Sequence, residues 1–224
     1  VGSVTVKLSD EGTYHITVGC TDMGTGCDTI IAQFAADVLE TPIDNISVYG
    51  VDTDISPYDS GSYASSTTYL TGMAAVKACE QLRERIIALA AVRMNKDASA
   101  LTFDGENVID ESDGAKMSLF DIATASMCNN EISLEVTYSH SSPVSPPPFM
   151  AACAEIEADP ETGAIELLDY TACVDCGTVV NTNLARVQTE GGLLQGIGMT
   201  LYEDIWYDER GKNLSNSFMQ YKVL

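Results

Sequence analysis

The stretch that most constrains the fold of this chain is residues 20–29, which read C-T-D-M-G-T-G-C-D-T. It follows an alternating apolar pattern over residues 14–18, typical of a half-buried strand, and precedes apolar residues at helical spacing over residues 30–39. Its two glycines allow the backbone to approach a ligand closely, and the first-turn N–H groups of the helix lack intrahelical acceptors. The stretch therefore predicts either a loop that holds a phosphate or a plain strand-to-helix turn in which Asp28 caps the helix.

Two common phosphate-binding motifs do not match this stretch. It lacks the Lys-Ser/Thr pair of a P-loop and the third glycine of a dinucleotide fingerprint. The sequence therefore predicts neither a P-loop nucleotidase nor a dinucleotide-binding domain.

A second loop of similar character covers residues 52–68, which are rich in Ser, Thr, Gly and Ala and contain few large apolar residues. A strong helix pattern follows over residues 66–91. The hydroxyl groups can simply cap this helix and bond their own backbone. They can also supply donors without bulk at a second helix start that is suited to anions.

The charge of the chain limits its partners. The 224 residues contain 33 acidic and 11 Lys or Arg side chains, which gives a formal net charge of −22. Such a surface excludes nucleic acid and anionic membranes as general partners. No run of 18 apolar residues occurs, and the start of the chain reads as a strand rather than as a signal region, so we expect a soluble, cytoplasmic protein without a visible targeting segment.

The seven cysteines do not follow the spacing of a disulfide framework, which favours a reducing compartment. Cys173 and Cys176 form a C-x-x-C pair, but no second pair or nearby histidine completes a zinc site. We therefore predict no metal bound directly by this chain.

The remaining patterns predict a small set of elements. Prolines at several positions of residues 141–148 require an extended linker between a first α+β subdomain, residues 1–140, and a second, residues 149–224. The second subdomain has a hairpin and a helix that begins at Asn181 or Asn183 and contains four glycines, which need a reason such as close approach of a backbone or cofactor. The other expected elements are a hairpin of residues 4–8 and 13–18, a strand at 46–51, a small hairpin at 101–109, a helix from Ser118 to about residue 128, a strand at 132–138, a hairpin of 149–157 and 165–174, and a strand at 202–207.

Four segments together resemble one enzyme family. They are T-D-M-G-T-G-C-D-T at residues 21–29, D-S-G-S-Y-A-S-S-T-T at 59–68, V-D-C-G-T-V-V-N-T-N at 174–183 and E-G-G-L-L-Q-G-I-G-M-T-L-Y-E at 190–203. Their order and spacing are similar to those of the xanthine dehydrogenase and aldehyde oxidase family of molybdenum hydroxylases over essentially the whole chain. The sequence departs from that family at Thr25, where glutamine is frequent, and at Thr182, where proline is usual.

The resemblance implies an α+β molybdenum cofactor-binding domain with mixed sheets and packed helices. The cofactor would be molybdopterin, in its cytosine dinucleotide form, with molybdenum. The residues that the resemblance assigns to the pterin phosphate region are Met23, Gly24, Thr25 and Gly26. Those assigned to the pyrophosphate are Ala64, Ser65 and Thr67, and Gln195 would bond an oxo ligand or the pterin near the metal. Tyr63 and Ala64 would lie near the substrate.

The resemblance also implies an activity, the hydroxylation of a heterocycle or aldehyde carbon with water as the oxygen source. The family's catalytic glutamate belongs to a G-x-G-E segment that these residues do not contain, so we expect no catalytic residue here and no activity of the chain alone. The remaining molybdopterin-binding half, and iron–sulfur and FAD domains or subunits, would be its partners, together with a small-molecule substrate. The alternative is a non-catalytic α/β domain that serves subunit assembly only.

Overall fold

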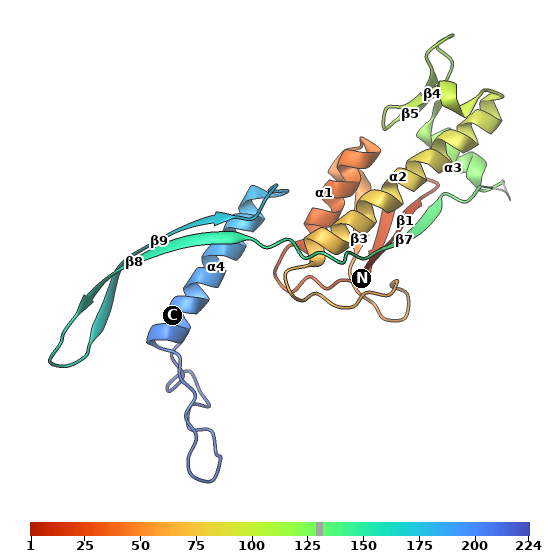
Figure 1. The fold of residues 1–224 in the computed structure, drawn as a ribbon. Coiled ribbons are helices and arrows are strands. Elements are labelled where there is room, and N and C mark those ends of the chain that lie inside the picture. Colours follow the sequence, from red (N-terminus) through yellow and green to blue (C-terminus); the bar gives the residue numbers. More distant parts are fainter. Residues whose placement is uncertain (129–131) are drawn as a thin grey trace. The chain divides into compact units, whose positions relative to one another are not determined.

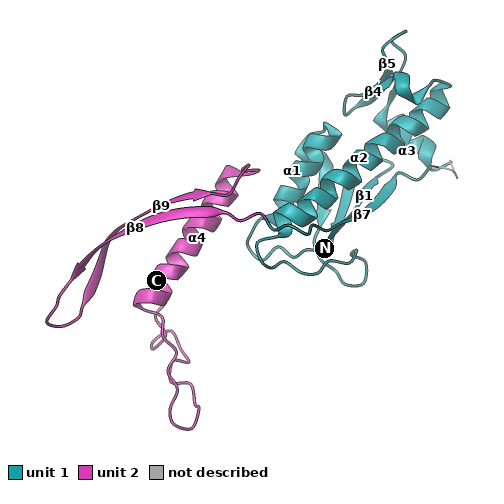
Figure 2. Ribbon diagram, in the orientation of Figure 1, with its two compact units in different colours: residues 1–145 teal, residues 146–224 magenta. Residues whose placement is uncertain are grey.

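The computed structural model describes residues 1–128 and 132–224, and it divides the chain into two compact units, residues 1–145 and residues 146–224 (Figure 2). Figure 1 shows their helices and strands. Each unit is described by itself. Within the described residues no helix is both long enough and apolar enough to cross a membrane.

The main sheet of the first unit has the strand order β3-β2-β1-β7. Its strands are β1 (Gly2–Leu8), β2 (Tyr14–Val18), β3 (Ile46–Tyr49) and β7 (Glu135–His140). The central strand β1 runs antiparallel to both neighbours, with Val4 opposite Val18 on β2 and Tyr138 on β7, whereas β2 and β3 are parallel. The alternating apolar residues of β1 and β2 are buried, which confirms the predicted hairpin.

Two helices cover one face of this sheet. They are α1 (Cys27–Leu39) and α2 (Thr67–Met94), which lie side by side in Figure 1. Small residues allow the close approach, because a Cβ on Gly72 of α2 would lie 2.5 Å from the ring of Phe34 on α1. Their buried side chains join those of the sheet in one core that extends to β4, β5 and α3.

A smaller sheet lies beyond the C-terminal end of α2. It contains β4 (Leu101–Phe103), β5 (Asn107–Asp110) and β6 (Lys116–Ser118) in antiparallel order, followed by α3 (Leu119–Ser126). The side chain of Ser118 accepts a hydrogen bond from the N–H of Asp121, so the predicted start of α3 is confirmed. Two 3₁₀ turns, η1 (Ile43–Asn45) and η2 (Ala98–Ala100), precede β3 and β4.

The second unit consists of a long hairpin and one helix. Strands β8 (Phe149–Ala158) and β9 (Ile165–Asp175) pair antiparallel, and the register shifts between Glu155 and Ile156. The helix is α4 (Thr182–Leu201). Its N-cap residue is Asn181, whose side chain accepts the N–H of Leu184. The hairpin and the helix are those expected from the sequence. Gly198 is the only buried residue of this unit.

The strand predicted for residues 202–207 is wrong. The N–H of Tyr202 bonds the carbonyl of Gly198 and closes α4, and the segment that follows makes only an isolated bridge between Tyr207 and Asn213. A strand pattern needs a partner strand, and none of the described segments pairs with this one beyond that bridge.

Candidate functional site

The two loops singled out in the sequence lie against each other in the first unit. We call residues 20–26 the glycine loop and residues 52–66 the Ser/Thr loop. The hydroxyl of Ser62 accepts the N–H of Thr21 at 3.0 Å and donates to the Thr21 carbonyl at 3.2 Å. Close to this contact, a Cβ on Gly19 would lie 2.5 Å from the Pro57 carbonyl, so glycine is needed for the loops to approach.

The glycine loop is organised around the Asp22 carboxylate. One oxygen accepts the N–H groups of Gly24 at 2.9 Å and Gly26 at 3.0 Å, while both glycines have positive φ, 98° and 74°. Burial raises the pKa of Asp22, but hydrogen bonds from backbone N–H groups outweigh this effect and the pKa is lowered. The start of α1 is therefore occupied by the chain's own carboxylate.

Of the two alternatives for this stretch, the one in which Asp28 caps α1 is wrong in its choice of cap. Gly26 is the N-cap residue and Asp28 lies inside the first turn, without a capping hydrogen bond. Asp22 has already satisfied N–H groups of the loop, which leaves Asp28 half-buried beside a second carboxylate. Burial, and then the charge of Asp22, raise the pKa of Asp28.

The Ser/Thr loop has a fixed and strained backbone. Asp59 accepts the N–H of Gly61 at 2.8 Å and the hydroxyl of Thr71 at 3.2 Å, which ties the loop to α2. The next residues include Ala64 and Ser65, two consecutive non-glycine residues with φ of 53° and 54°. Left-handed conformations at such residues are uncommon and concentrate at functional sites.

The start of α2 differs from the start of α1. Its N-cap residue, Ser66, donates its hydroxyl to the Tyr63 carbonyl at 2.8 Å instead of accepting a first-turn N–H. Across residues 1–128 and 132–224, no side chain caps the first turn of α2, and that turn contains no acidic residue. The first-turn N–H groups of this 28-residue helix therefore have neither a capping side chain nor an acidic residue of their own turn.

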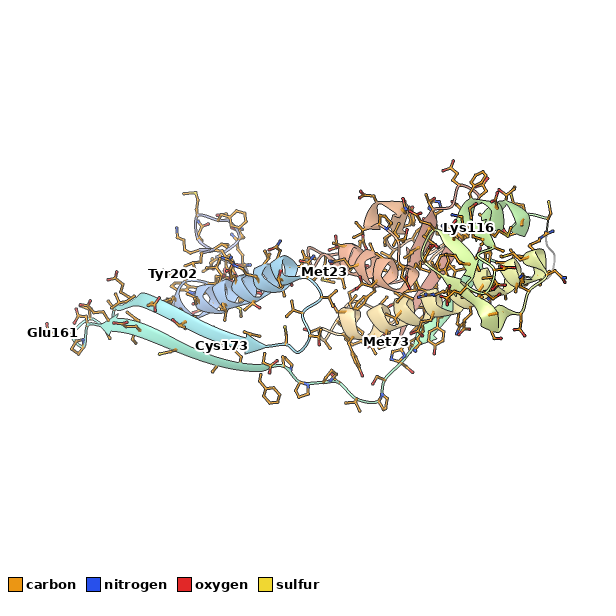
Figure 3. All side chains as sticks on the ribbon, turned by 90° about the horizontal axis from the view of Figure 1, so that it is seen from above. Met23, Met73, Lys116, Glu161, Cys173 and Tyr202 are labelled. Carbon is orange, nitrogen blue, oxygen red and sulfur yellow. The ribbon has the colours of Figure 1, made fainter. Side chains whose placement is uncertain are left out.

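The predicted site residues fall into two groups. Met23, Gly24, Thr25, Gly26, Tyr63, Ala64, Ser65 and Thr67 all belong to the two adjoining loops or to the first residue of α2. Met23 and Tyr63 are exposed, and Figure 3 shows Met23 near the N-terminal end of α1. Gln195 is exposed on α4 in the second unit, where its amide has no hydrogen-bond partner among the described residues.

Sequence reasoning missed the residues that hold the loops, namely Asp22, Asp59 and Ser62. A signal for the two aspartates was present, because each stands two residues before a glycine, and aspartate in this position bonds the backbone two residues later. Ser62 had no such signal, since its partner Thr21 is 41 residues away in the chain.

Possible metal ligands gather at the glycine loop. Asp22, Cys27 and Asp28 are the one set of at least three such side chains, within the part of the chain that the structure describes, whose ligand atoms lie within 4.8 Å of one another. Cys20 is close by, with its sulfur 3.9 Å from that of Cys27. The Asp22 carboxylate already binds loop N–H groups, so a cation would compete with the hydrogen bonds that shape the loop.

The sequence of the chain is similar to that of known proteins over nearly its full length. The family model described as "Molybdopterin cofactor-binding domain" matches residues 1–224. The chain is 36% identical over 217 residues to the probable hypoxanthine oxidase XdhD of Escherichia coli K12, covering 96% of this chain and 23% of that protein. It is 30% identical over 231 residues to the nicotine 6-hydroxylase large subunit of Paenarthrobacter nicotinovorans, covering 99% and 28%.

The fold of the chain is also similar to that of solved structures over its full length. The Cu,Mo-CO dehydrogenase matches with a TM-score of 0.86 at 27% identity, over 100% of this chain and 29% of that one. The quinoline 2-oxidoreductase of Pseudomonas putida 86 matches with a TM-score of 0.85 at 26% identity, over 100% and 29%. The chain thus spans about a quarter of the length of the curated relatives it matches, between 23% and 30%.

Proposed function

The chain belongs to the family of molybdopterin cofactor-binding domains, and from this premise we propose that its two adjoining loops hold molybdopterin in a larger molybdenum hydroxylase. The α+β fold, with its mixed sheet and packed helices, is that of the molybdenum-binding chains it resembles. The observation that carries the proposal is the uncapped start of α2 beside two strained residues of the Ser/Thr loop.

The start of α2 suits a phosphate group. Its first-turn N–H groups and the positive end of the helix dipole favour an anion, and the hydroxyls of Ser65 and Thr67 are near them in sequence. A chain with a net charge of −22 offers a polyanion no general attraction, so binding has to depend on such local donors. We propose that Ala64, Ser65 and Thr67 receive the pyrophosphate of the cofactor.

The glycine loop has a different role in this proposal. Because Asp22 accepts the N–H groups of Gly24 and Gly26, these donors are engaged and the loop is less suited to a phosphate than the start of α2. The exposed Met23 side chain remains for contact with the pterin end, close to its phosphate. We propose that Thr25 contributes to this contact, although its side chain also forms a hydrogen bond with Cys27. Gly24 and Gly26 hold the turn that presents them.

The remaining assignments follow the family. We propose that Gln195 offers its amide to the cofactor near the metal, and that Tyr63 and Ala64 border the substrate. When bound, the cofactor supplies the two-electron chemistry by which a substrate carbon acquires an oxygen from water. The side chains of this chain bind and orient the cofactor, and we propose no catalytic acid or base among them.

The complete enzyme is also part of the proposal. We propose that the complete enzyme acts on a heterocycle or an aldehyde and uses the cytosine dinucleotide form of the cofactor. We also propose that its iron–sulfur and FAD groups belong to other domains or subunits, and that it is located in the cytoplasm. Relatives named as a large subunit and as a subunit gamma of a dehydrogenase complex support a multi-subunit assembly. We further propose that these 224 residues alone do not turn over substrate, since the base of the family belongs to another segment.

A charge placed at Thr67 in the complete enzyme tests the phosphate site. Thr67→Glu adds a carboxylate to the first residue of α2, where negative charge stabilises a helix but repels a phosphate. We expect thermal stability to be kept or raised while molybdenum and pterin per protein fall about tenfold or more, the scale of a ~1.4 kcal/mol loss in binding. Thr67→Gln, of equal size and without charge, is the matched control and should retain most of the cofactor.

The outcome separates the proposed function from the assembly alternative. If Thr67→Glu retains the cofactor as fully as Thr67→Gln does, the start of α2 is not a phosphate site. Cofactor retention together with loss of subunit association would instead favour a domain that serves assembly only.

A further inference from the structure

Cys20 and Cys27 stand at the two ends of the glycine loop and face each other. Cys20 lies just after the C-terminal end of β2 (Tyr14–Val18), and Cys27 is the first residue of α1. Their sulfur atoms are 3.9 Å apart, with the Cys20 thiol donating to the Cys27 sulfur. Both residues are buried, with 1% and 4% of their surface exposed, although the loop between them is mostly exposed.

We propose that Cys20 and Cys27 are a redox-sensitive pair that small peroxides convert into an intrachain disulfide closing the glycine loop. A disulfide needs its sulfurs to approach to about 2.0 Å, so each has to move by roughly 1 Å. Rotation about the Cα–Cβ bonds and small backbone adjustments, which Gly24 and Gly26 permit, can supply this movement. In a reducing compartment such disulfides are usually transient and regulatory.

Cys27 is the sulfur that reacts first. At the start of α1 it benefits from the positive end of the helix, which favours a thiolate. The Cys20 thiol donates its hydrogen bond to the Cys27 sulfur, and this hydrogen bond also favours the thiolate form of Cys27. Cys20 is the donor of that hydrogen bond and therefore keeps its proton until the second step.

The chemistry balances in two steps. The Cys27 thiolate attacks one oxygen of the peroxide, a sulfur–oxygen bond forms, the oxygen–oxygen bond breaks, and the leaving oxygen takes a proton to become water or an alcohol. The Cys20 sulfur then attacks the Cys27 sulfur, the disulfide forms, the sulfur–oxygen bond breaks, and the leaving hydroxide takes the Cys20 proton as water. Two thiols lose two electrons in total, and the peroxide gains them.

The pairing distinguishes these cysteines from the other five. Cys79 is buried in the core, and Cys128, Cys153, Cys173 and Cys176 are exposed. Among the described residues, none of these five has another cysteine sulfur within hydrogen-bonding distance. The disulfide would fix the loop that carries Met23 and Thr25. Any effect on cofactor binding rests on the proposed function, whereas formation of the bond does not.

The sequence allows a direct test by mass spectrometry on the complete enzyme. No Lys or Arg occurs between Lys7 and Lys77, so trypsin releases one peptide, residues 8–77, whose only cysteines are Cys20 and Cys27. After hydrogen peroxide and then iodoacetamide, we expect this peptide without alkylation at either cysteine and lighter by two hydrogens. Cleavage before aspartates gives residues 10–21 and 22–27, which should stay joined until a reductant is added.

Variants and a defined negative result complete the test. Cys20→Ser should leave Cys27 as a sulfenic acid that dimedone traps, whereas Cys79→Ser should form the 8–77 disulfide like the parent protein. Circular dichroism before oxidation checks the fold of each variant, and the parent protein gives the result even if a variant is unstable. The proposal is overturned if both cysteines are alkylated after oxidation, or if Cys27 reaches the sulfinic acid while Cys20 is alkylated.

Discussion

Asp110 is an acidic residue that the fold has removed from solvent and paired with a cation. Only 2% of it is exposed, and its carboxylate accepts Lys96 at 2.8 Å and the N–H of Ser112 at 2.9 Å. Hydrogen bonding from Lys96, then from Ser112, lowers the pKa of Asp110 from 3.8 to about 2. This ion pair joins the segment after α2 to the small sheet.

The pH dependence of stability follows from that shift. A carboxyl group whose pKa is lower in the folded state stabilises the fold above its unfolded value of 3.8, and this contribution is lost as the pH falls toward about 2. Asp110→Asn should therefore lower the melting temperature at neutral pH, and the difference from the parent should shrink below about pH 4. Thermal unfolding over that pH range measures it, with the exposed Asp44→Asn as control. A difference that is independent of pH would mean that packing, not charge, holds Asp110.

Some features of the candidate site could be predicted from single residues of the sequence, and others could not. Residues 20–26 and the hydroxyl-rich stretch could be found from the sequence because glycine and serine restrict what such a loop can do. The left-handed φ values of Ala64 and Ser65 could not be found, since neither position carries a glycine or asparagine, the residues that usually mark such a backbone. The alternative in which Asp28 caps α1 rested on its place beside the helix, but Asp28 lies inside the first turn, and Asp22 accepts the N–H of the N-cap residue Gly26 from the loop.

At the level of elements, the turn between β4 and β5 shows how the small sheet meets α1. Gly105 has a φ of 91°, and a Cβ there would lie 1.9 Å from the carbonyl oxygen of Glu40, the residue that ends α1. Gly114, between β5 and β6, has a φ of 75° and open space. The two glycines share the positive φ but differ in their surroundings.

This difference gives a paired prediction. Gly114→Ala should lower the free energy of unfolding by about 1–2 kcal/mol, the cost of a left-handed backbone for a residue with a Cβ. Gly105→Ala should lower it by a further ~1–3 kcal/mol, because the clash with a backbone oxygen forces the elements apart. Urea unfolding followed by circular dichroism measures both. Equal losses would show that β4 and β5 move away from α1 without cost.

The sequence predicts elements better than contacts between them. Hairpins and helices follow from local periodicity and turn residues, and most of those expected are present. The turn at Asp104 and Gly105 was expected, but its contact with Glu40 joins residues far apart in the chain. The strand expected at residues 202–207 failed for the same reason, since alternation alone does not provide a neighbouring strand.

For the whole molecule, burial is divided unequally between the two units. Every buried hydrophobic side chain of the described residues belongs to residues 1–145, while Gly198 alone is buried in residues 146–224. Folding requires enough buried apolar surface to offset the loss of chain entropy. The second unit by itself does not have it.

Separate expression of the two units tests this division. The polypeptide of residues 1–145 should unfold cooperatively on heating, because it retains the whole core. The polypeptide of residues 146–224 should show no cooperative transition and poorly dispersed amide resonances. A sharp melting transition in the second polypeptide would contradict the prediction, and circular dichroism and proton NMR decide between the outcomes.

The place of β1 in the main sheet also sets an order of events during synthesis. This strand is made before both of its neighbours and obtains β2 at once, but its other neighbour is β7, with Gly2 opposite His140. A chain that emerges at about 5–20 residues per second therefore spends several seconds with one edge of its central strand open. Pairing over so long a separation is slow, because the intervening loop has to be closed first. The sheet is thus completed only after residue 140 has left the ribosome.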